Sequence, residues 1–125
     1  MPERILILQS DTNGRKALSD FFLQRGDEVW STESASKALN ILDEQSPELA
    51  FIDLHLPEEL WLNVLSHIRQ DHPKTKTIIT NREPDVRLEL LAKEQGARVF
   101  LRAPFTTTWI ERALDKLTSR DRPPS

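Results

Sequence analysis

The segment LAFIDLHLP, residues 49–57, decides the fold of this chain. Its first four residues form a continuous apolar run of strand length, which is typical of a strand buried on both faces of a parallel sheet. The run ends at Asp53, and Pro57 marks a turn shortly afterwards. In open sheets of this kind, ligands bind beyond the carboxyl ends of the strands. The segment therefore predicts a buried strand that carries an aspartate at a functional edge.

On either side of this segment, short apolar runs alternate with helical patterns. Further strands are predicted at residues 5–8, 28–31, 77–80 and 99–101, and helices at residues 11–25, from 35 to before Pro47, from about 61 to the turn at 71–73, 84–96 and from about 106 to 117. Parallel neighbours need a crossover connection, which a helix usually supplies. The alternation predicts an α/β fold in which helices cover both faces of a doubly wound, five-stranded parallel sheet.

Composition restricts the class of protein. The chain has 125 residues, of which 38% are hydrophobic and 30% charged, and it contains no cysteine. These values are ordinary for one soluble globular domain, and they leave no thiolate for a disulfide or a zinc site. A formal net charge of -3 argues against direct binding to nucleic acid or to an anionic membrane. With no long apolar segment, the sequence favours a cytoplasmic domain.

The domain is expected to span residues 1–118. Residues 119–125 are polar and contain Pro123 and Pro124, which is typical of a tail or of the start of a linker. We therefore expect any output domain to follow this tail and to lie outside the chain.

The ends of the predicted strands resemble those of the receiver domains of bacterial response regulators, and the resemblance extends from Arg4 to about Leu117. Asp53 and the turn to Pro57 resemble the phosphoacceptor aspartate and its following turn. Thr80 stands where the family has a Ser or Thr. Phe100 stands at the aromatic switch position, and Ala103-Pro104 resembles the end of the fifth strand.

The resemblance implies a flavodoxin-like three-layer sandwich with strand order 2-1-3-4-5. It also implies phosphoryl transfer to Asp53 from a histidine kinase or a phosphotransfer protein, with Thr80 as the switch hydroxyl and Mg²⁺ as the cofactor. On this interpretation the chain is not a conventional enzyme, and its own chemistry is limited to self-phosphorylation and dephosphorylation.

The sequence departs from the family at the positions that carry this chemistry. Gln9 and Ser10 replace two adjacent acidic residues, and Ala103 replaces a lysine. Neutral oxygens hold Mg²⁺ less well than carboxylates do, so we expect a weak site made by Asp11 and Asp53. Arg102 is expected to face solvent, because neighbouring side chains on a strand point to opposite faces.

Four further residues have less support from the pattern. His55 could reach the mouth of the pocket from its place two residues after Asp53. His67 and His72 have no ligand partners at metal-binding spacing and are expected to be solvated. Trp61 replaces a family glycine, and it either covers the pocket or extends the apolar face of its helix.

Two functions therefore remain open. The first is a phosphorylatable receiver with a degraded magnesium and phosphate pocket. The second is a pseudo-receiver that docks or dimerises without phosphate, with residues 84–117 as the candidate homodimer face. The sequence disfavours a nucleotide-binding enzyme, because the only glycines are Gly14, Gly26 and Gly96, and these form neither a glycine-rich phosphate loop nor a G-x-G-x-x-G motif.

Overall fold

The computed structural model describes residues 2–121, and for residues 119–121 it describes the backbone alone. Strands and helices alternate along the whole of this range. In chain order they are β1 (Arg4–Leu8), α1 (Thr12–Gln24), β2 (Glu28–Thr32), α2 (Ala35–Gln45), β3 (Leu49–Asp53), α3 (Glu58–Asp71), β4 (Lys76–Asn81), α4 (Val86–Glu94), β5 (Val99–Arg102) and α5 (Thr107–Asp121). No helix among the described residues has the length and apolar character that crossing a membrane requires.

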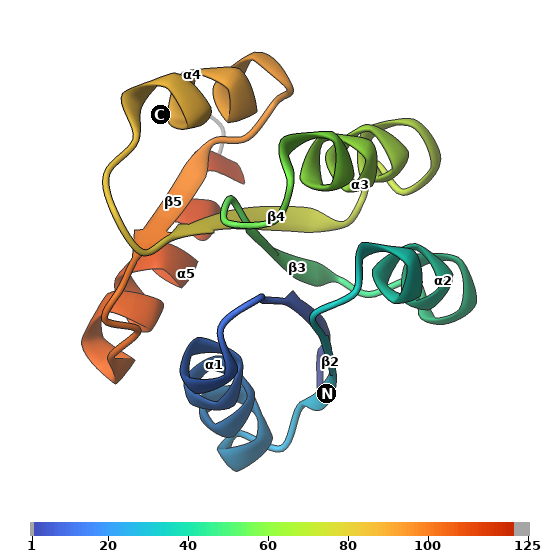
Figure 1. The fold of residues 1–125 in the computed structure, drawn as a ribbon. Helices are drawn as coiled ribbons and strands as arrows, with labels where there is room; N and C mark the ends of the chain where they lie inside the picture. The colour runs from blue at the N-terminus through green and yellow to red at the C-terminus, as the bar shows by residue number, and fades with distance from the viewer. Residues whose placement is uncertain (1, 122–125) are drawn as a thin grey trace.

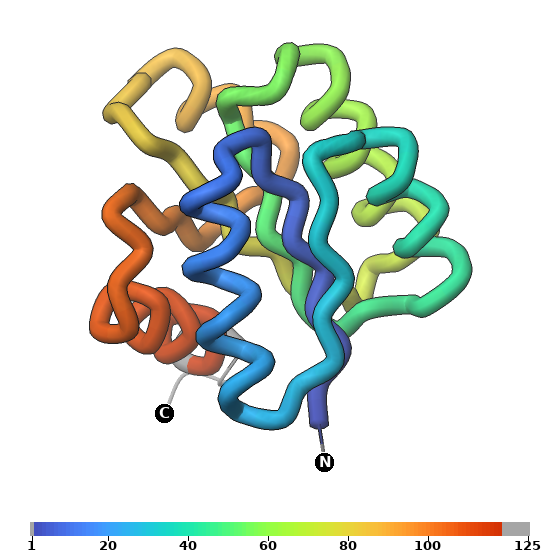
Figure 2. Tube along the Cα trace, turned by 60° about the horizontal axis from the view of Figure 1, so that its bottom comes forward, coloured from blue at the N-terminus to red at the C-terminus, as the bar shows by residue number. Residues whose placement is uncertain are grey.

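All five strands are parallel and lie in the order β2-β1-β3-β4-β5. Helices α1 and α5 cover one face of this sheet, and α2, α3 and α4 cover the other (Figure 1). Figure 2 shows α1 and α5 side by side, with α2 and α3 beyond the strands. The predicted flavodoxin-like, three-layer architecture and its strand order are confirmed.

Along the central strands, successive side chains point to opposite faces of the sheet, and this divides the core into two layers. Ile5 and Ile7 of β1 pack toward α1 and α5, whereas Leu6 and Leu8 pack toward α2, α3 and α4. All four side chains are completely buried. Because successive side chains on a strand point to opposite faces, an unbroken apolar run is what a sheet covered on both faces requires.

Helices α4 and α5 have bounds that differ from the prediction. Helix α4 begins at Val86, because the Asp85 carboxylate caps it by accepting a hydrogen bond from the Leu88 N–H at 3.1 Å. Pro84 therefore precedes the cap and does not open the helix. Helix α5 continues to Asp121, so residues 119–121 of the expected tail are helical, and residues 122–125 lie outside the described residues.

Trp61 belongs to the core. It is completely buried in α3, within the layer formed with α2 and α4. Of the two interpretations left open by the sequence, extension of the apolar helix face is the one that the structure supports. The indole N–H has no hydrogen-bond partner.

Candidate functional site

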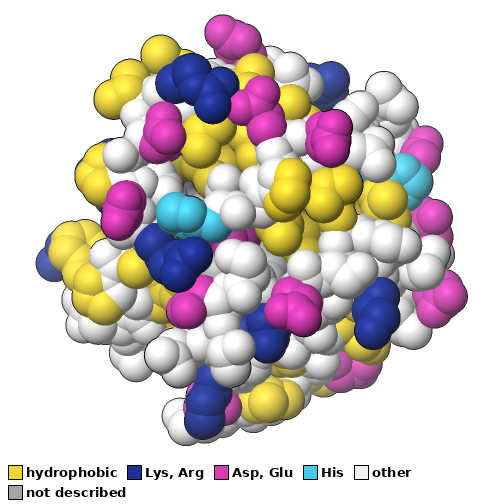
Figure 3. All heavy atoms as spheres, in the orientation of Figure 1, with side chains coloured by type: hydrophobic (Ala, Val, Ile, Leu, Met, Phe, Trp, Pro, Cys, Tyr) yellow, Lys and Arg dark blue, Asp and Glu magenta, His cyan; other side chains and the backbone are white. Residues whose placement is uncertain are grey.

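The candidate site lies where β1, β3 and β4 end. Asp53 closes β3 and pairs in register with Thr80 of β4, while Gln9, Ser10 and Asp11 follow β1. Since parallel strands end at the same edge of a sheet, these residues meet although they are far apart in the sequence. In the space-filling view, acidic, basic and histidine side chains lie together over the loops at this edge (Figure 3).

Asp53 is almost fully buried, with 2% of its surface exposed. Its Oδ2 atom accepts hydrogen bonds from the Ser10 backbone N–H at 2.8 Å and from the Ser10 hydroxyl at 2.6 Å. Its Oδ1 atom accepts one from the His55 backbone N–H at 2.9 Å. Both carboxylate oxygens are thus bonded to neutral donors of the protein itself.

Gln9 and Thr80 form a second buried pair beside Asp53. The Gln9 side-chain amide donates a hydrogen bond to the Thr80 hydroxyl. The Thr80 hydroxyl in turn donates to the Ile52 carbonyl oxygen at 3.3 Å. Thr80 is completely buried, and Gln9 is 2% exposed. The predicted switch hydroxyl therefore accepts from Gln9 and donates to Ile52, and its donation to a group on Asp53 would require the hydrogen bond to Ile52 to break.

Asp11 caps α1 and pairs with Arg82. One of its oxygens accepts a hydrogen bond from the Gly14 N–H at 2.7 Å and so caps α1. Its other oxygen lies 3.7 Å from an Arg82 nitrogen, in a partly exposed ion pair. Both oxygens of Asp11 are therefore engaged with Gly14 and Arg82, in keeping with its role at the start of a helix.

Ala103, Pro104 and Phe100 lie at the β5 side of the edge. The Ala103 N–H donates to the Asn81 carbonyl at 2.9 Å, and its methyl group supplies no positive charge. The Ala103–Pro104 peptide bond is cis, and Pro104 is exposed. Phe100 is half-buried against the α4 layer, with the Lys93 ammonium 5.5 Å from its ring centre.

Arg102 does not replace the missing lysine. Its guanidinium pairs with the Glu89 carboxylate of α4 at 3.3 Å, and its side chain is 56% exposed. The expectation that Arg102 lies on the surface is correct, and the structure adds that an ion pair holds it there.

Arg82 is a cationic residue of this edge that the sequence argument missed. Besides its ion pair with Asp11, its backbone N–H donates to the His55 ring at 3.3 Å. A signal was present in the sequence, because Arg82 follows Thr80 by the same two positions by which His55 follows Asp53. This spacing brings both residues to the mouth of the pocket.

His67 and His72 are not simply solvated, and that expectation was wrong. Nε2 of His67 lies 2.7 Å, and Nε2 of His72 2.8 Å, from the same Oδ1 atom of Asp43. Asp43 is on α2, whereas His67 is on α3 and His72 follows it. Spacing along the sequence could not reveal the contact, because it depends on how the two helices pack.

A buried aspartate at the end of the third of five parallel strands, opposite a threonine at the end of the fourth, is the arrangement of a receiver-type signalling domain. Residues 5–115 match the family model described as "Response regulator receiver domain". The chain belongs to this family, as the sequence indicated.

Individual relatives agree with this assignment. The chain is 26% identical over 117 residues to the chemotaxis protein CheY of Bacillus subtilis, covering 93% of this chain and 98% of that protein. It is 30% identical over 120 residues to the response regulator protein FleR of Pseudomonas aeruginosa, covering 96% of this chain but 24% of FleR. The chain thus spans about a quarter of that longer relative.

Solved structures support the fold. A CheY-like receiver domain protein from Methanospirillum hungatei superimposes with a TM-score of 0.83 at 21% identity, covering 97% of this chain and 98% of the other. A response regulator from Thermotoga maritima gives a TM-score of 0.83 at 21% identity, covering 95% and 99%. At these identities the likeness concerns the fold.

Proposed function

We propose that this chain is a receiver domain that signals mainly through protein contacts, with little or no dependence on a magnesium-supported acyl phosphate at Asp53. The observation that carries the proposal is the closed environment of that carboxylate. Ser10 and His55 satisfy both of its oxygens, and 2% of the residue is exposed. Three of the roughly four acceptor sites of this carboxylate are taken, so a phosphoryl donor would have to reach the site that is left on Oδ1 of an almost fully buried residue.

The donor set around Asp53 does not fit Mg²⁺ well. This ion needs near-octahedral oxygen ligands and usually takes one or two carboxylates together with phosphate oxygens and water. Ser10 directs an N–H and a hydroxyl at Asp53 where the family has an acidic side chain, and Asp11 is bonded to Gly14 and faces Arg82. The proposed affinity for Mg²⁺ through Asp11 and Asp53 is therefore weak.

The absence of a lysine at position 103 is also expected to slow the phosphorylation of Asp53. Ala103 has no cation to offer a developing or finished phosphoryl group, and Arg102 is paired with Glu89. Fixed charges and donors usually supply the largest part of catalysis, and removing one donor has cost about 3 kcal/mol in enzymes. Self-phosphorylation from a small donor is accordingly expected to be very slow.

A second candidate function is phosphotransfer to Asp53 from a histidine kinase or a phosphotransfer protein. It is favoured by the register that sets Asp53 opposite Thr80, and by Arg82 at the pocket mouth. In this reaction the phosphorus–nitrogen bond of a phosphohistidine breaks and a phosphorus–oxygen bond to the Asp53 carboxylate forms. The partner would have to supply the positioning that the pocket lacks.

The proposed contact surface is the α4–β5–α5 face, within residues 84–117. It exposes three large apolar side chains, Val86 at 73%, Leu90 at 53% and Trp109 at 49%. Trp109 stacks with Arg112, whose guanidinium carbon lies 4.9 Å from the ring centre. The face carries charges of both signs. This composition suits a symmetric dimer in which the face contacts the same face of a second copy of the chain.

The longer relatives suggest an output domain as a second partner for the same face. The chain covers 24% of FleR and 22% of the regulatory protein AtoC of Escherichia coli, so those proteins contain further sequence. An output domain attached beyond residue 125 would be the partner to which this receiver passes its signal.

The decisive experiment compares the wild type with Asp53→Asn in two assays. Beryllofluoride with Mg²⁺, a mimic of the acyl phosphate, should bind weakly or not at all to the wild type. Incubation with the phosphorylated cognate kinase should transfer little or no phosphate. Tight beryllofluoride binding or rapid transfer, abolished in both cases by Asp53→Asn, would overturn the proposal in favour of the second candidate.

The contact face has its own test. Leu90→Glu should abolish self-association measured by sedimentation, because it places a charge in the apolar patch. Leu23→Glu is the matched control, since Leu23 is 55% exposed on α1, away from this face. Equal self-association of the wild type and Leu90→Glu would contradict a dimer through α4, β5 and α5.

A further inference from the structure

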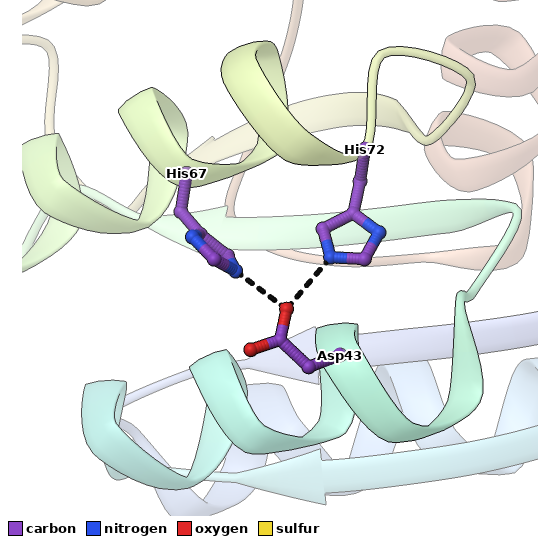
Figure 4. A group of neighbouring side chains, drawn as sticks. All are labelled: Asp43, His67 and His72. Atoms are coloured by element: carbon purple, nitrogen blue, oxygen red, sulfur yellow. Dashed lines mark hydrogen bonds and ion pairs between the residues drawn. The ribbon is translucent and has the colours of Figure 1, made fainter.

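Asp43, His67 and His72 form a compact cluster between α2 and α3. Figure 4 shows the two imidazole rings reaching from α3 and its end toward one carboxylate on α2. Nε2 of His67 and Nε2 of His72 lie 2.7 and 2.8 Å from the same oxygen of Asp43. One ligand atom from each of the three residues lies within 4.8 Å of the other two.

The fold brings these side chains together at the end of the domain opposite Asp53. Both helices run back from the carboxyl edge of the sheet, so their last turns lie near its amino edge. Asp43 is in the last turn of α2, and His72 caps the end of α3 by donating its backbone N–H to the Ile68 carbonyl. The cluster is therefore separate from the phosphoacceptor pocket, and the two can be tested independently.

Two imidazole nitrogens and one carboxylate oxygen are a common ligand set for a catalytic-type, open zinc site, in which water takes the fourth position. Ligands of a tetrahedral zinc ion lie about 3.4 Å apart, given metal–ligand bonds of about 2.1 Å. The hydrogen-bonded distances of 2.7 and 2.8 Å are shorter than this. Because the Asp43 side chain is 56% exposed, a small rotation of it would open the space.

Asp71 adds a second feature of metal sites. One of its carboxylate oxygens lies 3.1 Å from Nδ1 of His67, on the far side of the ring from Asp43. A carboxylate in this position fixes the tautomer and the orientation of a ligating histidine, and it raises the basicity of the other ring nitrogen. In the metal-free cluster Nε2 of His67 holds the proton that it donates to Asp43, and a bound metal ion would take the place of that proton.

We propose that Asp43, His67 and His72 bind one Zn²⁺ ion, with Asp71 positioning His67, and that the ion links the last turn of α2 to the end of α3. Imidazole and carboxylate ligands together favour zinc and its neighbours in the first transition series over Mg²⁺ and Ca²⁺, which prefer oxygen ligands alone. The site requires no change in the fold. It does not depend on phosphorylation or on the state of Asp53.

The bare cluster offers a competing account, in which the two histidines only share hydrogen bonds with Asp43. The two accounts differ in measurable ways. A metal site binds one equivalent of Zn²⁺, loses it when either histidine is replaced, and releases protons as the ion binds. A cluster held by hydrogen bonds alone gives no saturable binding at these residues.

The experiment is a calorimetric titration of the 125-residue chain with Zn²⁺ after treatment with a chelator. One equivalent is expected to bind. His67→Gln and His72→Gln should each weaken the affinity at least about tenfold, and Asp71→Asn should weaken it by roughly tenfold, as outer carboxylates do. Loading with Co²⁺ should give a visible absorption band that both histidine variants lose.

Matched controls identify the site. His55→Gln replaces the third histidine of the chain, and Asp20→Asn replaces a surface carboxylate that pairs with Lys16. Both should bind Zn²⁺ like the wild type, and so should Asp53→Asn. Urea unfolding in chelator shows whether each variant is folded.

NMR of the histidine ring protons provides a readout that does not depend on the variants. Signals of His67 and His72 should shift on addition of Zn²⁺, while that of His55 should not. Absence of saturable binding to the wild type, or unchanged binding to folded His72→Gln, would overturn the proposal. Failure of the proposed function would instead appear at Asp53, with zinc binding unaffected.

Discussion

Ser10 donates both its backbone N–H and its hydroxyl to one oxygen of Asp53, at 2.8 and 2.6 Å. The family's acidic side chain at this position would repel the Asp53 carboxylate and share a cation with it. Here a neutral side chain binds the carboxylate directly. Ser10 therefore supplies no carboxylate ligand for a metal ion, and it also forms hydrogen bonds to the phosphoacceptor carboxylate. For both reasons we propose that the pocket binds Mg²⁺ poorly.

Restoring the charges should restore the pocket in part. The double variant Ser10→Asp with Ala103→Lys returns one carboxylate for Mg²⁺ and one cation for the phosphoryl group. Its binding of beryllofluoride with Mg²⁺ should be at least roughly tenfold tighter than that of the wild type, or about 1.4 kcal/mol. Calorimetry measures the change, and adding Asp53→Asn should remove it. No gain in a folded double variant would show that other features limit the pocket.

The hydroxyl of Ser10 should contribute to stability. Ser10→Ala removes the 2.6 Å hydrogen bond to the Asp53 carboxylate but keeps the one from the backbone. Hydrogen bonds to charged groups contribute about 1.5 to 3 kcal/mol, so we expect a loss of about 1.5 kcal/mol in the free energy of unfolding. Urea denaturation measures it. Ser36→Ala, at an exposed position of α2, is the control and should change stability by less than about 0.5 kcal/mol.

Trp61 should be a major contributor to the core. Trp61→Ala removes a completely buried ring and should cost about 3 to 5 kcal/mol in the free energy of unfolding. Trp109→Ala removes the same side chain from a site that is 49% exposed, and it should cost much less. If urea denaturation gave equal losses for the two variants, Trp61 would not have the packing described above.

Acid should weaken the contact between α2 and α3. In metal-free protein, hydrogen bonds from His72 and then from His67 lower the pKa of Asp43 below its ordinary value of 3.8. A folded-state pKa that is lower than the unfolded one gives stability that is present above about pH 4 and is lost as the pH falls through the folded value. An NMR titration of the Asp43 carboxyl carbon should show this low midpoint.

The partner variant isolates the cause. Of the two hydrogen bonds, the one from His72 lowers the pKa of Asp43 more, and His72→Ala removes it. The titration midpoint of Asp43 should therefore move up toward 3.8. Replacing Asp20, a partly exposed carboxylate on α1, should leave the Asp43 midpoint unchanged. An Asp43 midpoint that is the same in His72→Ala and in the wild type would contradict this contact.

The sequence by itself determined the layered fold and the place of its functional edge. Apolar runs of strand length, such as Ile5–Leu8 and Leu49–Ile52, separated by helical stripes, allow few arrangements other than a parallel sheet covered on both faces. The same pattern located Asp53 at a strand end, and simple inspection of Gln9, Ser10 and Ala103 showed that charges were missing.

Only the tertiary structure decided which side chains meet. Ser10 and Asp53 are separated by 43 residues, and Gln9 and Thr80 by 71. Asp43 contacts His67 and His72 across 24 and 29 residues. Periodicity reports which face of an element is buried, but the distance between polar groups on two helices depends on how those helices pack against the sheet. The closed phosphoacceptor and the histidine cluster were therefore beyond the reach of the sequence.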